Sequence, residues 1–448
     1  MPVMRILQWE QLNPTERSAI LHRGIGTIFG DELKTAIGRI IEDVRLNGDE
    51  AVSRALRDFD KISVEPDQLR VTEGEFAAAR KAVDSSVTAA IKDMIDHIRR
   101  FNEQVMERKG ADWMWESEPG LLVGEKVTPI HSAGLFCPSG KASYPSVLAQ
   151  IGTPAVVAGV PLRVVITPPV PGSPTAEVDA ATLVVADLLG LHEVFRVNGP
   201  AGVAAVAFGT QSIPKVLKVI GPGAPAVVCA QIEVQRYGCS TMMLLGPSES
   251  LILADDTADP FRLAADLLNE AEHGTDSTAL LITPSRTLAD ATNVALAAQI
   301  AVLPPKRREA AEAALGLNGG CILVRSMQEG AEVANAFGPE HMQIVAADHH
   351  AILALVHTAG EILLGQETTI SAANFIIGCP ASLPTSGFAS VSSGITAETF
   401  LKRTAVAEAN NVAMRRMAPS VIALAEHEGF PAHANAQHLR LRETVPVV

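Results

Sequence analysis

The sequence contains several short runs of β-branched and aliphatic residues in which apolar and polar residues do not alternate. These runs are residues 163–167, 194–197, 251–254, 279–283, 321–324 and 362–364. Stretches with helical periodicity separate them. A strand that is apolar on both faces is typical of a parallel sheet covered by helices on both sides. The sequence therefore predicts an α/β protein with two parallel-sheet domains in tandem.

The positions of these runs divide the chain into four parts. Residues 1–30 predict a short N-terminal helical arm without a core of its own. Residues 31–135 together with 250–394 predict the first parallel-sheet domain, and residues 136–249 predict the second. Residues 395–448 predict a C-terminal tail, helical from about 397 to 425, whose polar end is not expected to fold by itself.

Composition narrows the class of protein. Of the 448 residues, 47% are hydrophobic and 19% charged, so the chain can bury a large core. The net charge of -14 argues against a nucleic-acid surface, which needs clustered Lys and Arg. Five scattered cysteines without a C-x-x-C pair favour a reducing compartment. With no visible signal peptide or membrane-spanning run, we expect a cytoplasmic enzyme with no membrane partner.

The first candidate site is at the end of a predicted helix. Asp259-Pro260 is a typical helix start, because Asp caps the first turn and proline lacks the N–H that would be unpaired there. Glu270 and His273 are three residues apart, so they share one side of the helix and can reach one metal ion. The alternative is a solvated helix end that carries charges.

Three further positions carry candidate chemistry. Gly338-Pro339-Glu340-His341 predicts a helix start at which the acid and the imidazole could hold a base near neutral pH; the alternative is an ordinary acidic first turn. His433 on the tail and Asn374 could complete a metal site of three or four ligands. Their alternatives are a solvent-facing histidine and a capping residue. No G-x-G-x-x-G or phosphate-binding loop follows any predicted strand.

Several blocks together resemble the histidinol dehydrogenase family, in the family's order and over essentially the whole chain. They are Ala271-Glu272-His273-Gly274-x-Asp276-Ser277, Gly338-Pro339-Glu340-His341, the segment 207–216, Gly221-Pro222-Gly223, Gly246-Pro247-Ser248-Glu249, Leu383-Pro384-Thr385 and the segment 428–433.

The resemblance implies a fold, an activity and an assembly. Such enzymes are homodimers of two Rossmann-like domains without the usual glycine fingerprint, and a C-terminal segment reaches into the partner's active site. The resemblance places the substrate and the metal on the first domain, residues 31–135 with 250–394, and NAD on the second, residues 136–249. They bind one zinc ion and oxidise a small polar alcohol to an acid through the aldehyde, using NAD twice. By resemblance, Glu340 activates water and His341 takes the alcohol proton. Ser248, Glu428 and the zinc ion hold the substrate.

The chain departs from the family at the metal site. The family's zinc ligands are glutamine, histidine, aspartate and histidine. The matching positions here are Glu270, His273, Asn374 and His433. The two exchanges offset each other, which leaves one carboxylate, two imidazoles and one neutral oxygen, and we therefore expect zinc still to bind. The alternative is a site without metal, in which Glu270 and Asn374 hydrogen-bond to each other.

The chain also departs from the family at positions that contact the substrate and the cofactor. A family histidine that contacts the substrate's polar end is replaced within Pro380-Ala381-Ser382. The tyrosine, glutamine and asparagine that contact NAD are replaced by Phe136, Ala201 and Ala224. These changes leave open whether the substrate is L-histidinol or another small polar alcohol such as a sulfonated diol, whether one or two oxidations occur, and whether the cofactor is NAD or NADP. A non-catalytic metal-binding or ligand-binding descendant is a further alternative.

Overall fold

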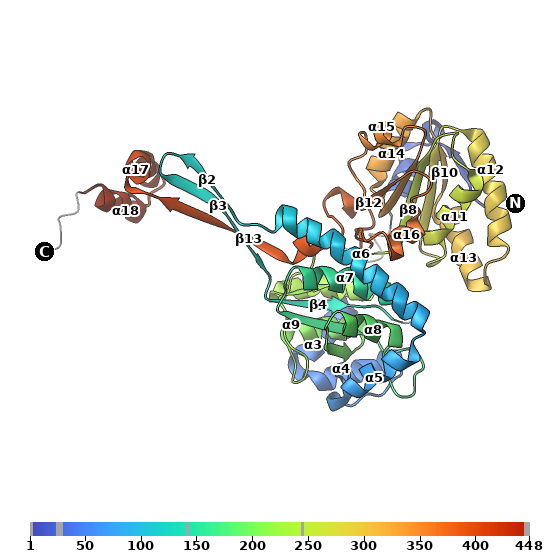
Figure 1. Cartoon of the computed structure of the whole chain (residues 1–448), viewed down its shortest axis with the longest axis horizontal. Coiled ribbons are helices and arrows are strands. Elements are labelled where there is room, and N and C mark those ends of the chain that lie inside the picture. Colours follow the sequence, from blue (N-terminus) through green and yellow to red (C-terminus); the bar gives the residue numbers. More distant parts are fainter. Residues whose placement is uncertain (1–2, 24–29, 140–142, 243–245, 443–448) are drawn as a thin grey trace. The chain divides into compact units, whose positions relative to one another are not determined.

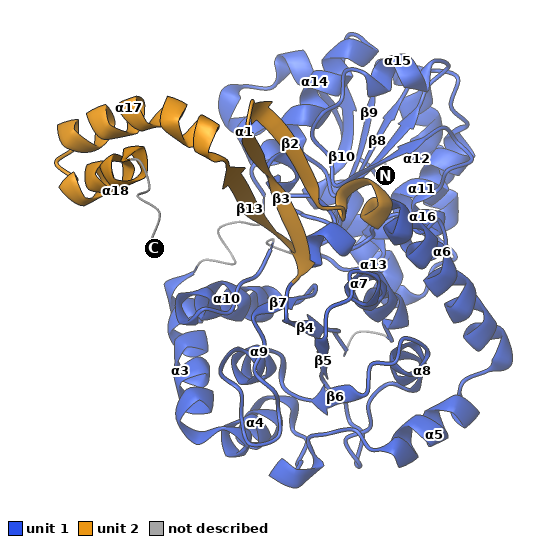
Figure 2. Cartoon of the chain, turned by 60° about the vertical axis from the view of Figure 1, so that its left-hand side comes forward, with its two compact units in different colours: residues 1–104, 130–400 blue, residues 105–129, 401–448 orange. Residues whose placement is uncertain are grey.

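The computed structural model describes residues 3–23, 30–139, 143–242 and 246–442 and divides into two compact units (Figure 2). Unit 1 comprises Met1–Gln104 and Ile130–Phe400, and unit 2 comprises Val105–Pro129 and Leu401–Val448. Parts of the predicted arm (1–2 and 24–29) and of the predicted tail (443–448) lie outside the described residues.

Unit 1 contains a six-stranded parallel sheet among its described residues, in the order β1-β10-β9-β8-β11-β12. The strands are β1 (Ile6–Gln8), β8 (Glu249–Ala254), β9 (Thr278–Thr283), β10 (Gly320–Leu323), β11 (His341–Val345) and β12 (Glu361–Leu364). β8 and β9 are buried at every position, and this explains why their sequences are apolar without alternation.

Helices cover both faces of this sheet. One face packs against α11, α12 and α13, and the other against α1, α14 and α15 (Figure 1). The bounds are α1 (Pro14–Leu21), α11 (Pro260–Ala271), α12 (Arg286–Ile300), α13 (Pro305–Ala313), α14 (Met327–Phe337), α15 (His349–Leu353) and α16 (Ile370–Phe375), with short helices η1 (Trp9–Gln11), η5 (Ala314–Asn318), η6 (Phe388–Ser390) and η7 (Ala397–Phe400). Successive residues of β8 point to opposite faces of the sheet. Leu251 belongs to the hydrophobic core on the side of α14, and Ile252 belongs to the core on the side of α11.

A second parallel sheet in unit 1 has the order β6-β5-β4-β7 over its described strands. The strands are β4 (Ser132–Phe136), β5 (Leu162–Thr167), β6 (Glu193–Arg196) and β7 (Lys218–Ile220), and the helices that follow them are α7 (Pro145–Val157), α8 (Ala180–Leu188), α9 (Gly199–Phe208), α10 (Pro225–Val234) and η4 (Gln235–Tyr237). The chain turns from β4 to one side for β5 and β6, and to the other for β7. In open α/β sheets, ligands bind beyond the carboxyl ends of the strands at such a switch point. The prediction of two parallel-sheet domains is therefore confirmed.

The helices of residues 31–82 pack against helices of this second sheet, α8, α9 and α10, although the prediction from the sequence placed them with the first domain. They are α3 (Asp31–Asn47), α4 (Asp49–Ala55), η2 (Leu56–Asp60), η3 (Pro66–Gln68) and α5 (Glu73–Ala82), and they precede the long α6 (Ser85–Lys109). The apolar stripe of α3, with Ile37 and Ile41, lies in one core cluster with Phe195 of β6 and Val206 of α9. Helical periodicity identifies a buried stripe but not the sheet that buries it. The N-terminal arm likewise contributes a strand, β1, to the six-stranded sheet.

Unit 2 contains an antiparallel sheet that the sequence analysis did not predict. Its described strands have the order β13-β3-β2, with β2 (Trp113–Glu118), β3 (Leu121–Pro129) and β13 (Leu401–Ala409). The prediction of helix from about 397 to 425 is wrong over β13, because nine residues of this segment pair with β3. Two helices follow, α17 (Asn411–His427) and α18 (Pro431–Leu441), and they pack on each other, so the tail end is more ordered than expected.

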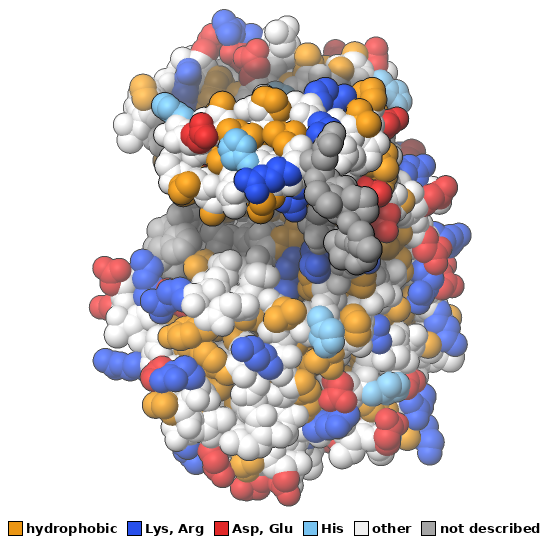
Figure 3. All heavy atoms as spheres, turned by 90° about the vertical axis from the view of Figure 1, so that its left-hand side faces the viewer, with side chains coloured by type: hydrophobic (Ala, Val, Ile, Leu, Met, Phe, Trp, Pro, Cys, Tyr) orange, Lys and Arg blue, Asp and Glu red, His pale blue; other side chains and the backbone are white. Residues whose placement is uncertain are grey.

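Unit 2 exposes large apolar side chains. Trp113 and Trp115 of β2 are exposed, as are Leu424 and Phe430 of the helical pair. The face that carries α17 and α18 shows hydrophobic side chains among polar ones (Figure 3). Among the described residues, no helix of the chain is long and apolar enough to cross a bilayer.

Candidate active site

Helix α11 presents a buried carboxylate near its C-terminus. The Asp259 side chain caps the helix by accepting hydrogen bonds from the N–H groups of Phe261 and Arg262, as the sequence predicted. Eleven residues on, Glu270 is buried with only 2% of its surface exposed. The fixed start and the apolar face of α11 therefore hold Glu270 against the six-stranded sheet.

Two other predicted metal ligands lie against Glu270. The Nδ2 of Asn374 in α16 donates to Glu270 Oε1 at 2.7 Å. The Nδ1 of His273 is 3.4 Å from Glu270 Oε2 and 3.0 Å from the Asn269 carbonyl oxygen. Glu270 of α11, His273 just beyond the end of α11 and Asn374 of α16 thus converge, and the Glu–Asn hydrogen bond expected for a metal-free site is present as well.

The predicted helix start at Glu340-His341 is wrong, because His341 is the first residue of strand β11. Gly338 ends α14 in the left-handed conformation, at φ 59°, and Pro339 follows. The chain then enters the sheet directly, so the acid and the imidazole do not lie at a helix N-terminus. Glu340 and His341 are both buried instead, at 8% and 2% exposure.

A carboxylate that the sequence analysis did not select, Glu361, holds the imidazole. Its Oε1 is 2.5 Å from His341 Nδ1, and Glu340 Oε1 is 3.8 Å from His341 Nε2. Burial by itself would lower the pKa of His341, but the carboxylates of Glu270, Glu340 and Glu361 outweigh burial and raise it to about 10. The imidazole therefore lies in a strongly negative environment.

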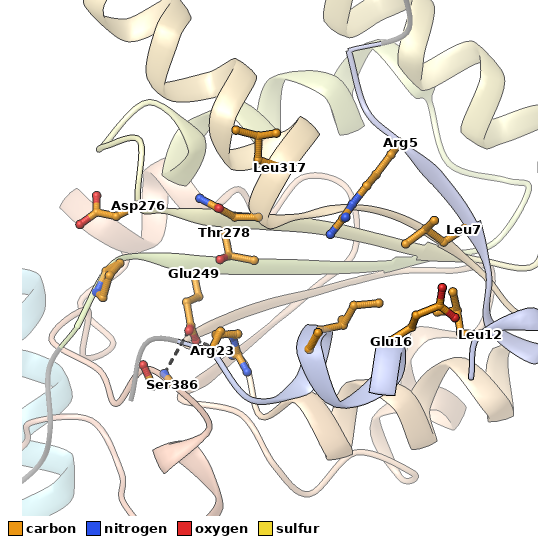
Figure 4. Close-up of a pocket in the computed structure, with 14 residues that line it drawn as sticks. Arg5, Leu7, Leu12, Glu16, Arg23, Glu249, Asp276, Thr278, Leu317 and Ser386 are labelled. Atoms are coloured by element: carbon orange, nitrogen blue, oxygen red, sulfur yellow. Dashed lines mark hydrogen bonds and ion pairs between the residues drawn. The ribbon is translucent and has the colours of Figure 1, made fainter. Parts of the chain in front are cut away.

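Burial raises the pKa of Glu340 to about 8, and Glu270 adds to the rise. Glu340 Oε2 accepts a hydrogen bond from the Glu249 N–H at 2.9 Å. The Glu249 carboxylate in turn pairs with Arg23 at 2.6 Å and accepts from the Ser386 N–H at 3.0 Å (Figure 4). The cluster thus extends from the catalytic candidates to the end of the N-terminal arm.

A cavity of about 460 Å³ opens beside this ion pair (Figure 4). Arg5, Arg23, Glu249 and Asp276 line it together with apolar side chains of the N-terminal arm. Its lining includes Glu249 but neither Glu340 nor Glu270, so it lies next to the acid–imidazole cluster rather than at its centre.

The remaining substrate and metal candidates lie in different places. Ser248 is half-buried immediately before Glu249, and its carbonyl accepts from the Thr278 N–H. Glu428 is the C-terminal cap of α17, and His433 lies in the first turn of α18 with its ring 5.3 Å from that of Phe430. Glu428 and His433 are exposed and belong to unit 2, whereas the other candidates belong to unit 1.

The three positions expected to contact NAD lie at the carboxyl end of the four-stranded sheet. Phe136 ends β4, Ala201 lies in the first turn of α9 after β6, and Ala224 caps α10 after β7. At Gly221 a Cβ atom would lie 2.0 Å from the Phe136 carbonyl oxygen, and its φ is 137°, so this approach requires glycine. The backbone here fits the switch-point rule, but the three side chains offer no polar contact.

The charge balance of the cluster is suited to a cation. Glu249, Glu270, Glu340 and Glu361 are all buried, and Arg23 is paired with Glu249. No group of three or more His, Cys, Asp and Glu side chains with metal-binding geometry occurs among residues 3–442 as far as they are described. The predicted ligands do not form such a group, because Asn374 is an amide and His433 belongs to unit 2. The Glu270 carboxylate, the His273 imidazole and the Asn374 amide nevertheless offer the oxygen and nitrogen atoms that zinc accepts as ligands.

Two site residues were missed from the sequence, Glu249 and Glu361. Each is buried and is the first residue of a strand, and each precedes an aliphatic run, 251–253 or 362–364. An acid in this position does not identify a site by itself. Its role depends on the strand order, which brings β8 and β12 to either side of β11.

Two doubly wound sheets, with a buried imidazole held between carboxylates, define an α/β enzyme suited to acid–base chemistry. The histidinol dehydrogenase family model matches residues 27–441. A "Histidinol dehydrogenase homolog" of Colwellia psychrerythraea is 39% identical, covering 98% of this chain and 97% of that protein. The "Histidinol dehydrogenase" of a Synechocystis strain is 38% identical, with coverages of 98% and 99%.

A solved structure agrees with these sequence matches. The crystal structure of histidinol dehydrogenase from Elizabethkingia anophelis superposes with a TM-score of 0.92 at 28% identity, covering 98% of both chains. The chain therefore belongs to the histidinol dehydrogenase family, and the class of enzyme is a dehydrogenase that acts on a CH–OH group.

Proposed function

We propose that this protein is an NAD-dependent, zinc-assisted alcohol dehydrogenase that oxidises L-histidinol through the aldehyde to L-histidine. The observation that carries the proposal is the buried His341 imidazole, which lies between the carboxylates of Glu340 and Glu361 and in the electrostatic field of Glu270. Buried acid–imidazole groups with perturbed pKa values are typical of catalytic sites. Family membership supports the same reaction class.

His341 is proposed to accept the proton of the substrate hydroxyl. Its raised pKa reflects the three neighbouring carboxylates, and a cation beside Glu270 would offset part of that negative charge and lower the pKa of His341 toward neutrality.

Glu340 is proposed to activate water for the second oxidation. Because burial raises the pKa of Glu340 to about 8, its carboxylate form increases as the pH rises through that value. Oxidation of the aldehyde should therefore accelerate between pH 7 and about 9, as a pH–rate profile would measure.

Zinc is proposed to be held by Glu270, His273 and Asn374 together with His433 of the partner subunit, and it would supply a Lewis-acid contact that orients the substrate oxygen. For its oxygen to face the metal, the Asn374 amide must turn over and give up its present hydrogen bond to Glu270. NAD would accept the hydride at the carboxyl end of the four-stranded sheet.

A homodimer with shared active sites is part of the proposal. Glu428 and His433 are exposed beside the turn between α17 and α18, where they are available to another subunit. The exposed tryptophans of β2 support an association surface in the same unit, because large aromatic side chains are enriched at protein interfaces.

A second substrate class, another small polar alcohol, is favoured by one observation. Ala381 occupies the place where the family resemblance gives a substrate-contacting histidine. Sequence identity to relatives does not decide between histidinol and another small polar alcohol as the substrate. Relatives named "Histidinol dehydrogenase homolog" are 39–40% identical, and one named "Histidinol dehydrogenase" is 38% identical.

The test is NADH formation by purified protein with L-histidinol and a panel of other polar alcohols, a sulfonated diol among them, together with elemental analysis. We expect turnover of at least one alcohol and zinc in the purified protein. Glu270→Ala should lose the zinc, whereas Glu367→Ala, at an exposed acid of the same unit, should keep it. Absence of zinc after growth in ample zinc would refute the metal site, and no oxidation of any alcohol would refute the activity.

A further inference from the structure

The register of the six-stranded sheet places Glu361 beside His341. Strands β11 and β12 are parallel, and His341 and Glu361 are paired residues at the amino ends of the two strands. Paired residues of adjacent strands direct their side chains to the same face of a sheet. The contact is therefore built into the strand pairing and does not depend on a loop conformation.

The two side chains form a buried carboxylate–imidazole pair. Their exposed fractions are 2% for His341 and 6% for Glu361, and the Nδ1 to Oε1 distance is 2.5 Å. The other oxygen, Glu361 Oε2, is buried and has no hydrogen-bond partner among the described residues. His341 is thus the hydrogen-bonding neighbour that the structure gives this carboxylate.

The chemistry of the pair fixes the state of the imidazole. An ionised carboxylate can only accept a hydrogen bond, so His341 Nδ1 must carry the hydrogen. In the neutral imidazole, Nε2 is then the nitrogen with a free lone pair, and it is Nε2 that faces Glu340. A carboxylate that holds the tautomer of a catalytic histidine in this way is known from hydrolase triads.

We propose that Glu361 is a positioning residue that holds His341 with hydrogen on Nδ1, so that Nε2 accepts the proton of the substrate hydroxyl. The inference rests on the proposed function. In the step it supports, the O–H proton moves to Nε2, the carbon-bound hydrogen leaves with its electron pair to the oxidised nicotinamide, and the C=O bond forms. Glu361 remains ionised and stabilises the resulting imidazolium across the same hydrogen bond.

The test compares three variants under steady-state conditions. Glu361→Gln retains the shape but allows the amide to donate to Nδ1, which favours the wrong tautomer, so kcat should fall by about 10²–10⁴-fold while KM stays within about threefold. Glu361→Ala should lose a similar factor and regain part of kcat with added formate, which restores a carboxylate, but not with formamide. Glu367→Gln, at an exposed carboxylate that pairs with Arg262, is the matched control and should behave as wild type.

Outcomes for the inference and for the proposed function can be told apart. Wild-type kcat in Glu361→Gln would overturn the positioning role while leaving the dehydrogenase activity in place. Loss of activity in both variants with an unchanged thermal midpoint but without any rescue by formate would also overturn it. If the wild-type protein oxidises no alcohol, the proposed function fails, and the positioning role of Glu361 fails with it.

Discussion

The two parallel sheets of unit 1 carry their functional candidates at opposite ends of the strands. In the six-stranded sheet, Glu249, His341 and Glu361 are each the first residue of a strand, and Glu340 directly precedes one. In the four-stranded sheet, the positions that the resemblance matches to cofactor contacts lie at the last residue of a strand or shortly after one. The usual rule for open α/β sheets places ligands at carboxyl ends. The second sheet follows the rule, and the first does not.

The two ends also differ in chemistry. The amino end of the six-stranded sheet gathers buried charges, whose positions are fixed by strand register and by hydrogen bonds such as that from the Glu249 N–H to Glu340. The carboxyl end of the four-stranded sheet presents apolar side chains and backbone, with glycine where the chain passes Phe136. The division of labour that we propose is that the first sheet supplies the reactive groups and the second receives the cofactor.

The largest expected effect is at the amino end. Replacing His341 by alanine removes the proposed proton acceptor, and kcat should fall by about 10²–10⁴-fold or below detection. Zinc content should not change, because His341 is not among the predicted ligands. Steady-state kinetics with the best alcohol and elemental analysis of the same sample measure both.

The matched control for this change is His357→Ala. His357 is exposed in the same unit, and its kinetics should match those of wild type. If His341→Ala retains near-normal turnover, the amino end of the six-stranded sheet is not the site of proton transfer, and the contrast between the sheets loses its functional meaning.

A smaller effect, on stability, is expected one helical turn before Glu270. Burial raises the pKa of Asp266 from 3.8 to about 6, against a smaller lowering by the neighbouring Gln343 side chain. The atoms Asp266 Oδ2 and Gln343 Oε1 have no hydrogen-bond partner among the described residues. A raised carboxyl pKa means that the folded state binds the proton more tightly than the unfolded state. The contribution of Asp266 to stability therefore falls as the pH rises from about 4 to about 6 and stays low above that.

Asp266→Asn removes the buried charge and can donate to Gln343 Oε1. The variant should be more stable than wild type at pH 8 by on the order of 1–2 kcal/mol and nearly equal to it at pH 4. Denaturant unfolding at the two pH values checks this. Asp290→Asn, at an exposed acid on α12, is the control and should show no such pH dependence. Equal effects of Asp266→Asn at both pH values would mean that this acid is not a buried charge in solution.

The same contrast explains what could be predicted from the sequence. Apolar runs and helix caps are local signals, so the strands at 251–254 and 279–283 and the capped start of α11 were predictable. The convergence of Asn374 on Glu270 depends on packing over about a hundred residues of separation, and only the family resemblance pointed to it. Glu361 could not be found, because its role follows from the pairing of β12 with β11. β13 was mistaken for helix because its partner β3 is distant in sequence.

The smallest expected effect sharpens the contrast at the carboxyl end of the second sheet. Ala224 is exposed at the N-cap of α10, where its methyl group accepts no hydrogen bond. Ala224→Asn restores the family's residue and should strengthen cofactor binding by about 0.5–1.5 kcal/mol, so the KM for NAD should fall by about two- to tenfold with little change in kcat.

Ala224→Ser separates the effect of the helix cap from that of a cofactor contact, because serine also caps the helix but is too short to replace the asparagine amide. If serine lowers the KM as much as asparagine does, the gain comes from the helix cap and not from a cofactor contact. If neither variant changes the KM, NAD does not approach this strand end, and the division of labour between the two sheets is wrong.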